Sequence, residues 1–277
     1  MKKSYIVIFL LILGYTAQAQ QGWNQKYSRK NQIYGYWGYN VSAYSKSDIS
    51  FVGQNYNFTI YDVKANDRPT PFDFDLYFNP ANLSIPQWNL RFGYFFADRW
   101  SISIGTDHMK YVMQQNQYVA MEGYINIPNG EYNGAYNRQP QELTSEFLMF
   151  EHTDGLNYGS IELEYHGNIY QFNDKHSINY YAGPGFGLLV PRSNVTLMGY
   201  DRYDEFHVAG YGLSGKVGLQ AVLWKHLTFN AEWKNGFISM QDILTTGDNP
   251  TDRAMQTFWF TEFTGTIGFV INAKRNQ

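Results

Sequence analysis

Apolar and polar residues alternate with a period of two along much of the chain. In the segment Leu213–Leu223 the odd positions are apolar residues or glycine, and the even positions include Lys216 and Gln220. Because successive side chains of a β-strand point to opposite faces, this pattern predicts a strand with one apolar and one polar face. Leu227–Lys234 repeats the pattern after a tight turn at Lys225-His226. Two strands joined by so short a turn form an antiparallel hairpin.

Segments with the same alternation recur from the beginning to the end of the chain. Most of them approach the roughly 9–11 residues that a tilted strand needs to cross a bilayer. The eight segments are, in order, Ile33–Asn40, Gln87–Phe96, Trp100–Gly105, Ile161–His166, Ile178–Leu188, Leu213–Leu223, Leu227–Lys234 and Trp259–Phe269.

The connections between these segments alternate regularly between short and long. Outer-membrane barrels have an even number of antiparallel strands, short periplasmic turns and long outer loops. The sequence therefore predicts an all-β fold, a transmembrane antiparallel β-barrel of about eight strands with short periplasmic turns and long extracellular loops. The short connections are Ala97–Arg99, Asn173–His176 and Lys225-His226, and the long ones are roughly Ser45–Leu83, Gln114–Gly159, Arg192–Val208 and Gln241–Ala254.

The first residues have the pattern of a secretory signal peptide. The pair Lys2-Lys3 is followed by an apolar stretch, Ile6–Leu13, and then by Ala17-Gln18-Ala19, which has small residues where signal peptidase cleaves. We expect cleavage after residue 19, so that residues 1–19 are the signal peptide and residues 20–277 are one barrel domain in the cell outer membrane. The alternative is an uncleaved anchor, although the apolar stretch is shorter than the about 20 residues of a spanning helix.

The composition agrees with strands that are apolar on one face only. Aromatic residues make up 18% of the chain, yet the mean hydropathy is −0.44. The formal net charge of −3 does not favour a nucleic-acid partner, which would select a clustered basic surface. The chain has no Cys, which excludes disulfides, thiolate catalysis and Cys-ligated zinc. No metal and no cofactor are expected, and outer-membrane lipid is the expected surrounding of the barrel wall.

The strand number, the two-faced strands and the alternation of loop length resemble those of the small eight-stranded outer-membrane barrels of the OmpA and OmpX type. The resemblance covers most of residues 20–277, is architectural and rests on no diagnostic motif. It implies the same barrel architecture and an outer-membrane location. The last strand departs from the common pattern, because Phe269 is followed by Val270-Ile271-Asn272 and a polar tail rather than by a terminal Phe.

The faces opposite the apolar ones carry charged residues of both signs, which would point into the barrel. An eight-stranded barrel is just wide enough for side chains to fill its interior, and charges buried there must be paired. We therefore expect a packed network of ion pairs in the lumen, with a gated pore or a proton path as the alternative. The residues are Arg91, Lys216 and Lys234, against Glu162, Glu164, Glu232 and Glu262.

Three histidines, His108, His152 and His207, lie toward the predicted outer rim and have acidic neighbours, such as Asp154 after His152. Together they could bind a metal or form an acid–base centre. Lipid-A-modifying barrels combine a His with a Ser and an acid, and the deacylase type places the Ser two residues after the His. No Ser stands at that position after any of the three histidines. This spacing weakens the hypothesis of an enzyme without removing it.

The long outer loops contain further hairpin patterns. Residues 49–60 flank a turn at Gly53-Gln54-Asn55, and Val119–Ile127 is followed by Pro128-Asn129-Gly130. Strands extended beyond the membrane would present a tyrosine-rich surface of the kind used in recognition. We interpret the chain as a structural or binding scaffold whose outer loops contact an extracellular protein or glycan, and we lean against an enzyme. The alternatives are an enzyme acting on outer-leaflet lipid through the rim histidines, and a narrow pore.

Overall fold

The computed structural model describes residues 28–79, 81–82, 85–200, 202, 205–247, 249 and 251–273, and the statements below refer to them. The predicted signal peptide, residues 1–19, lies outside the described residues, so its cleavage stays a prediction. Within the described ranges, no helix combines the length and the apolar character needed to cross a membrane.

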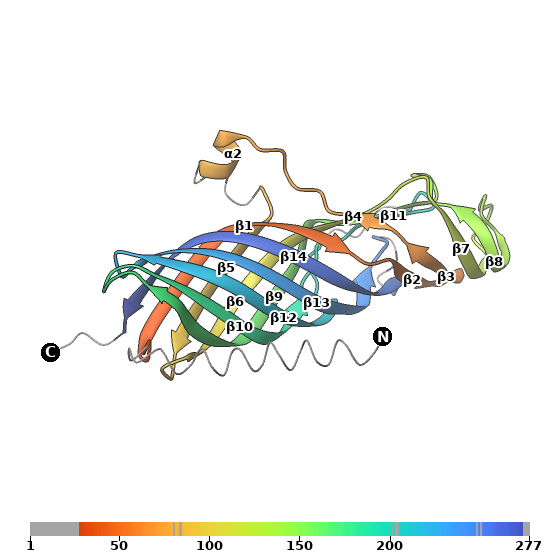
Figure 1. The fold of residues 1–277 in the computed structure, drawn as a ribbon. Coiled ribbons are helices and arrows are strands. Elements are labelled where there is room, and N and C mark those ends of the chain that lie inside the picture. The colour runs from red at the N-terminus through yellow and green to blue at the C-terminus, as the bar shows by residue number, and fades with distance from the viewer. Residues whose placement is uncertain are drawn as a thin grey trace, which may run out of the picture.

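Eight antiparallel strands form a closed barrel (Figure 1). Each strand pairs with its neighbours along the ring, and the last strand pairs with the first from Tyr44↔Phe260 to Gln32↔Asn272, which closes the sheet. Closure removes the unpaired edges that an open sheet would expose to lipid. The strands of the ring are, in order, β1 (Gln32–Tyr44), β5 (Trp88–Phe95), β6 (Trp100–Met113), β9 (Leu148–Gln171), β10 (Ser177–Leu189), β12 (Gly210–Leu223), β13 (Leu227–Leu244) and β14 (Arg253–Asn272).

The two faces of the barrel wall differ in polarity. In β9, Ile161 and Leu163 are 55% and 41% exposed on the outside, whereas Glu162 and Glu164 are each 1% exposed and point into the lumen. A wall that is apolar outside and charged inside suits the hydrocarbon of a bilayer, because in water it would form an apolar band around the molecule. The prediction of an eight-stranded transmembrane barrel is confirmed.

The predicted strands are too short at their outer ends. β9 begins at Leu148 rather than near Ile161, and β14 begins at Arg253 rather than Trp259. Beyond the lipid-facing belt the outward positions need not be apolar, so the period-two pattern fades there although the backbone remains extended. The alternation in the sequence therefore marks the membrane-spanning part of each strand.

Beyond the outer rim the wall continues into a second set of strands. β2 (Ser47–Gly53) pairs with the outer end of β14, and β3, β7 and β8 follow it in order. We call these strands, with β4, β11 and the outer ends of β6, β9, β13 and β14, the outer module. The hairpins predicted in the first two long loops are confirmed. The bounds of the remaining strands are β3 (Tyr56–Val63), β4 (Ala65–Asn66), β7 (Tyr118–Ile125), β8 (Gly134–Glu142) and β11 (Asn194–Leu197).

The outer module has a hydrophobic core of its own. Phe51 of β2 packs against Phe150 of β9 with ring centroids 5.9 Å apart, and Phe58 of β3 lies 6.0 Å from Phe147. All four side chains are buried. Full burial of each such side chain contributes roughly 1.5–3 kcal/mol, so the long predicted loops form a folded unit.

One connection leaves the outer module and runs along the outside of the barrel (Figure 1). It carries α2 (Phe74–Phe78), whose N-cap residue Asp73 accepts hydrogen bonds from the backbone N–H groups of Asp75 and Leu76. The sequence pattern did not predict this helix, because five residues are too few to show a helical period.

Candidate functional site

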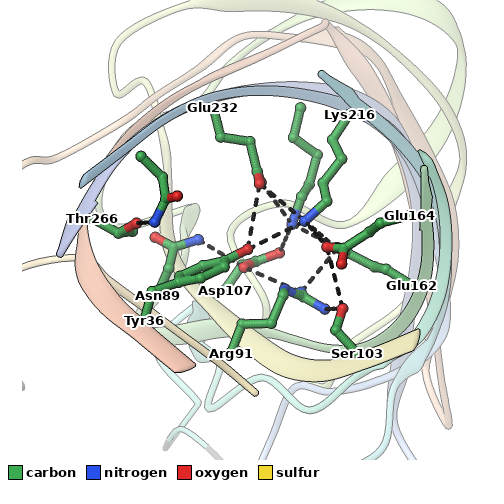
Figure 2. Close-up of polar contacts among 12 residues, drawn as sticks. Tyr36, Asn89, Arg91, Ser103, Asp107, Glu162, Glu164, Lys216, Glu232 and Thr266 are labelled. Carbon is green, nitrogen blue, oxygen red and sulfur yellow. Dashed lines mark hydrogen bonds and ion pairs between the residues drawn. The ribbon is translucent and has the colours of Figure 1, made fainter. Parts of the chain in front are cut away.

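A network of buried charges fills the middle of the barrel (Figure 2). It contains the seven residues that the alternation placed in the lumen, together with Asp107 of β6. All of these side chains are buried. We call them the lumen network: Arg91, Asp107, Glu162, Glu164, Lys216, Glu232, Lys234 and Glu262.

Lys216 of β12 joins acids from two strands. Its Nζ lies 2.6 Å from Glu162 Oε2, 2.6 Å from Glu164 Oε1 and 3.0 Å from Glu232 Oε2. The ammonium also donates to the hydroxyl of Tyr36 at 3.2 Å. A buried ammonium is tolerated only where its donors are used, and this site uses them on carboxylates and a phenol.

Glu162 of β9 contacts every cation of the lumen network. Its Oε1 lies 2.9 Å from Arg91 Nη2 and 3.0 Å from Lys234 Nζ, and its Oε2 contacts Lys216. Lys234 also pairs with Asp107. The ion pairs thus tie together β5, β6, β9, β12 and β13 across the lumen.

Glu262 of β14 is bound differently from the other acids. Its Oε1 accepts a hydrogen bond of 2.7 Å from Asn89 Nδ2, which also donates to Asp107 at 2.7 Å. Within the described ranges no Lys or Arg forms an ion pair with Glu262, and its Oε2 has no hydrogen-bond partner. The acids of the lumen network therefore outnumber its cations, and Glu262 is the one held by an amide.

Glycines on the inner face make room for these side chains. A Cβ atom at Gly185 would lie 2.9 Å from Glu162 Cγ and 2.6 Å from Ser214 Oγ. Any larger residue at this position would push the central carboxylate of the lumen network out of place. Gly185 is thus explained by packing in the lumen, whereas a Cβ atom at Gly183 or Gly187 would meet the backbone of β9.

Further side chains fill the lumen on both sides of the lumen network. Toward the short-turn end, Arg29 donates to Gln220 at 2.8 Å, and Gln220 to Asn230 at 2.9 Å. A cavity of about 420 Å³ opens at this end, lined by residues such as Arg29 and Asn179. Toward the outer end, Tyr158 and Phe260 pack with ring centroids 6.0 Å apart and lead into the core of the outer module.

Sequence reasoning missed Asp107 as a member of the lumen network and Asn89 as its hydrogen-bond partner. The predicted strand ended at Gly105, because Thr106 and His108 break the apolar outer face. The inner face nevertheless continues through Ser101 and Ser103 to Asp107, so following the inner positions alone would have found it.

The three rim histidines lie in separate surroundings, and no hydrogen bond or ring contact among the described residues joins any two of them. His108 stacks on Trp88 on the outside of the barrel, with ring centroids 5.6 Å apart. His207 Nε2 lies 2.6 Å from Asp242 Oδ2. Asp154 pairs with Arg192 at 3.6 Å. Within the described part of the chain no group of three or more His, Cys, Asp or Glu could hold a metal ion.

His152 lies in a buried polar cluster at the base of the outer module. Its Nδ1 is 2.8 Å from Ser193 Oγ, and its Nε2 is 3.5 Å from Gln256 Oε1. Gln256 in turn donates to Tyr111 at 2.7 Å and to Ser47 at 2.9 Å. We call these five residues the rim cluster. A Ser–His hydrogen bond is part of many nucleophilic sites, but here both side chains are buried and an amide stands where an acid would orient the ring.

The position of the rim cluster sets the charge state of His152. This residue precedes the lipid-facing part of β9, which begins at Ile161. Burial lowers its pKa from 6.5 to about 4. The ring is therefore neutral at physiological pH, and it can accept the hydroxyl proton of Ser193 in a hydrogen bond.

The barrel wall, the lumen and the difference in connection length between the two ends are typical of one class of membrane protein. A closed ring with an apolar exterior, a polar interior, short turns at one end and long connections at the other is that of an outer-membrane protein. The chain is an outer-membrane β-barrel. No protein-family model matches it, and no curated protein matches it in sequence.

Several solved structures are similar in fold. The outer membrane protein OprG from Pseudomonas aeruginosa is 12% identical, with 90% of this chain and 100% of that chain covered and a TM-score of 0.41. Ail, the attachment invasion locus protein of Yersinia pestis, is 11% identical over 87% of this chain and 99% of that chain, with a TM-score of 0.33. The outer membrane protein AlkL is 10% identical over 92% and 96%, with a TM-score of 0.38.

Proposed function

We propose that the barrel is a membrane-embedded scaffold that presents its outer module to an extracellular protein or glycan. The observation that carries this proposal is that the long connections form a sheet with its own hydrophobic core, continuous with the barrel wall through β14 and β2. Mobile loops would not need such a core. A folded module on a rigid support holds a recognition surface in one geometry, which lowers the entropy cost of binding.

The filled lumen supports a scaffold rather than a conduit. The charged side chains of the lumen network are at most 7% exposed and bridge the barrel at one level. An ion or solute would have to break several buried ion pairs to pass, and toward the outer end it would meet buried side chains such as Tyr158 and Phe260.

The outward side of the outer module offers a surface for recognition. Tyr118 and Tyr124 of β7 are 69% and 49% exposed. Arg138 of β8 lies over the ring of Tyr61 at 4.3 Å and pairs with Glu122 at 3.3 Å. We call these five residues the tyrosine face. Tyrosine supplies large contact areas with little loss of side-chain entropy, which is why it is common at binding surfaces.

A binding experiment with matched tyrosine variants tests the proposal. Cells that display the protein would be applied to a panel of immobilised surface glycans and extracellular-matrix proteins. We expect Tyr118→Ser with Tyr124→Ser to abolish adhesion to whichever probe retains the wild type. Tyr170→Ser, an exposed tyrosine at the short-turn end, should leave adhesion unchanged. Equal adhesion by both variants, or ion-channel steps from the purified protein in planar bilayers, would contradict the proposal.

The enzyme alternative is favoured by a single observation, the hydrogen bond between His152 and Ser193. Its nucleophile and base lie within reach of each other but are covered by the core of the outer module. We expect Ser193→Ala and His152→Ala to leave the lipid A mass spectrum of the cell unchanged, as should alanine at His108 and His207. A lost acyl or phosphate modification in any of these variants would favour the enzyme over the scaffold.

A further inference from the structure

The connection from β4 to β5 lies on the outside of the barrel wall and does not join the outer module. Figure 1 shows α2 beside β1, at the level of the barrel and well away from β2, β3, β7 and β8. We call the described residues of 68–87 the aromatic finger. In Figure 1 it runs from β4, at the outer rim, toward the short-turn end, and it joins β5 at Trp88, which is paired with Tyr39 of β1.

The aromatic finger turns its largest apolar side chains away from the protein. Phe72 and Phe74 are 75% and 72% exposed, and Phe78 and Ile85 are 59% and 46% exposed. The rings of Phe74 and Phe78 stack on each other at 4.7 Å and contribute one apolar surface. Such a cluster is unfavourable in water, so a surface of this kind normally has a partner.

The contact between α2 and the wall fixes the level of the aromatic finger. Tyr39 of β1 packs against Tyr77 with ring centroids 4.6 Å apart, and its hydroxyl donates to the Tyr77 carbonyl. Tyr39 is paired with Gly265 of β14, which stands between the exposed residues Phe263 and Ile267. The apolar outer face of β14 continues past this point to Trp259, so α2 touches the wall inside the lipid-facing belt.

Several polar groups of the aromatic finger are hydrogen-bonded within it. The Asp75 carboxylate accepts hydrogen bonds from the side-chain amides of Asn79 and Asn82, at 2.8 and 2.7 Å. The Tyr77 hydroxyl donates to the Thr70 carbonyl at 2.6 Å, and Asp73 caps α2. Internal pairing is what a segment requires where water is scarce, because an unpaired polar group in hydrocarbon costs several kcal/mol.

A cation holds the two ends of the aromatic finger together at the rim. Lys110 of β6 donates to the carbonyl of Ile85 at 3.0 Å and to the hydroxyl of Thr70 at 3.4 Å. Arg68 forms an ion pair with Glu151 of β9. The finger is therefore attached at the outer rim, and α2 lies from there toward the short-turn end of the barrel (Figure 1).

We propose that the aromatic finger inserts Phe72, Phe74 and Phe78 among the acyl chains of the outer leaflet. The partner is lipid hydrocarbon, because the finger rests on the lipid-facing wall and not on the surface that faces the cell exterior. Interfacial segments bind in this way, with aromatic side chains buried below the headgroups and polar groups above. The finger widens the barrel's contact with lipid on the side of β1 and fixes its depth.

The absence of Cys from the chain makes a direct test possible. Phe74→Cys and, separately, Phe72→Cys would each be labelled with bimane in the full mature chain, folded into phosphatidylcholine vesicles. We expect nitroxide-labelled acyl chains to quench both probes and aqueous iodide to leave them bright. Phe263→Cys on the wall serves as the lipid-facing control, and Tyr124→Cys on the outer module as the water-facing control.

The quenching pattern shows whether lipid, water or protein covers the phenylalanines of the aromatic finger. Quenching by the nitroxide lipid to the extent seen at position 263 supports insertion. Quenching by iodide to the extent seen at position 124 overturns it, since the finger would then lie in water. A probe quenched by neither agent also overturns it, because a protein surface, such as a second copy of the chain, would then cover the phenylalanines. Two independent positions, with folding checked by circular dichroism, keep a single misfolded variant from deciding the result.

Discussion

Among single residues, Glu162 is the junction on which the lumen network depends. Its carboxylate is the only one in the described residues that contacts Arg91, Lys216 and Lys234 together. Removing one partner of a buried ion pair costs more than the pair itself contributes, because the remaining charges keep their desolvation penalty. Glu262 offers the contrast, since an amide side chain is its partner.

We expect Glu162→Gln to lower the free energy of unfolding by roughly 3–5 kcal/mol, because it removes the one carboxylate that the three buried cations share. Arg91→Leu should act in the same direction. Glu262→Gln is the matched control, because a glutamine oxygen can still accept the hydrogen bond from Asn89, and its stability should stay near that of the wild type. Urea unfolding in lipid vesicles, followed by tryptophan fluorescence, measures all three. Wild-type stability of Glu162→Gln would mean that water screens these charges.

The alternation in the sequence was sufficient to assign individual side chains to the lumen. Glu162 and Glu164 occupy alternate positions with Ile161 and Leu163, so their direction follows from the strand alone. For the histidines the alternation is not sufficient to assign a direction. His108 shares the outward direction of Ile102 and Ile104, but the bulges and long connections around His152 and His207 break the count between them and the wall. The sequence placed the three histidines near the outer rim, but it could not show whether their side chains lie on the same face of the barrel wall.

At the scale of elements, the rim cluster joins strands of the barrel to the outer module. Ser47 belongs to β2, Tyr111 to β6, His152 to β9 and Gln256 to β14, and Ser193 precedes β11. The β6–β9 pair carries a register shift between Met109 and Tyr111. Bulges are common at barrel rims, where they redirect a strand. The rim cluster therefore lies where the strands of the wall change direction, and its hydrogen bonds stabilise this change.

We expect the outer module to loosen in acid before the barrel does. The folded pKa of His152, about 4, lies below its unfolded value of 6.5. The folded form therefore binds this proton more weakly, so stability is complete above pH 6.5 and falls as the pH drops toward 4. The full difference corresponds to roughly 3 kcal/mol. Hydrogen-exchange protection factors for β2 and β3 at pH 7 and pH 5 measure it.

The variant His152→Asn is the control for this pH dependence. Asparagine does not titrate in this range and can still hydrogen bond to Ser193. The outer module of the variant should keep the same protection at both pH values, while the lumen-facing strands are unaffected in either protein. A loss of protection that persists in His152→Asn would assign the acid sensitivity to another group.

The orientation of the elements gives a second prediction at this scale. Tyr124→Cys in the outer module should react with a membrane-impermeant maleimide on intact cells, because β7 lies beyond the outer rim. Asp174→Cys, in the turn between β9 and β10, should react only after the outer membrane is permeabilised. Both positions are exposed in the folded protein, so accessibility from outside is the only difference. The reverse labelling pattern would mean that the barrel has the opposite orientation in the membrane.

At the scale of the whole molecule, the barrel was predictable and the outer module was predictable only in pieces. Eight two-faced segments with alternating short and long connections fix the ring, because each neighbour pair is also adjacent in the sequence or closes it. The hairpin at residues 53–55 was visible for the same reason. The pairing of β3 with β7 was not, because residues 56–60 meet residues 121–125 and no local pattern records that partnership. Long-range pairing depends on the whole set of competing surfaces.

The length of β14 has a mechanical consequence. This one strand pairs with β13 and β1 inside the membrane and with β2 outside it, so a pull on the outer module passes into the barrel along the strand axis. In that direction the interstrand hydrogen bonds are loaded in shear and share the force, whereas a hairpin peeled from its end would lose them one at a time. If the outer module binds a partner as proposed, the connection between module and wall would therefore resist a pull along the strand axis through many hydrogen bonds at once.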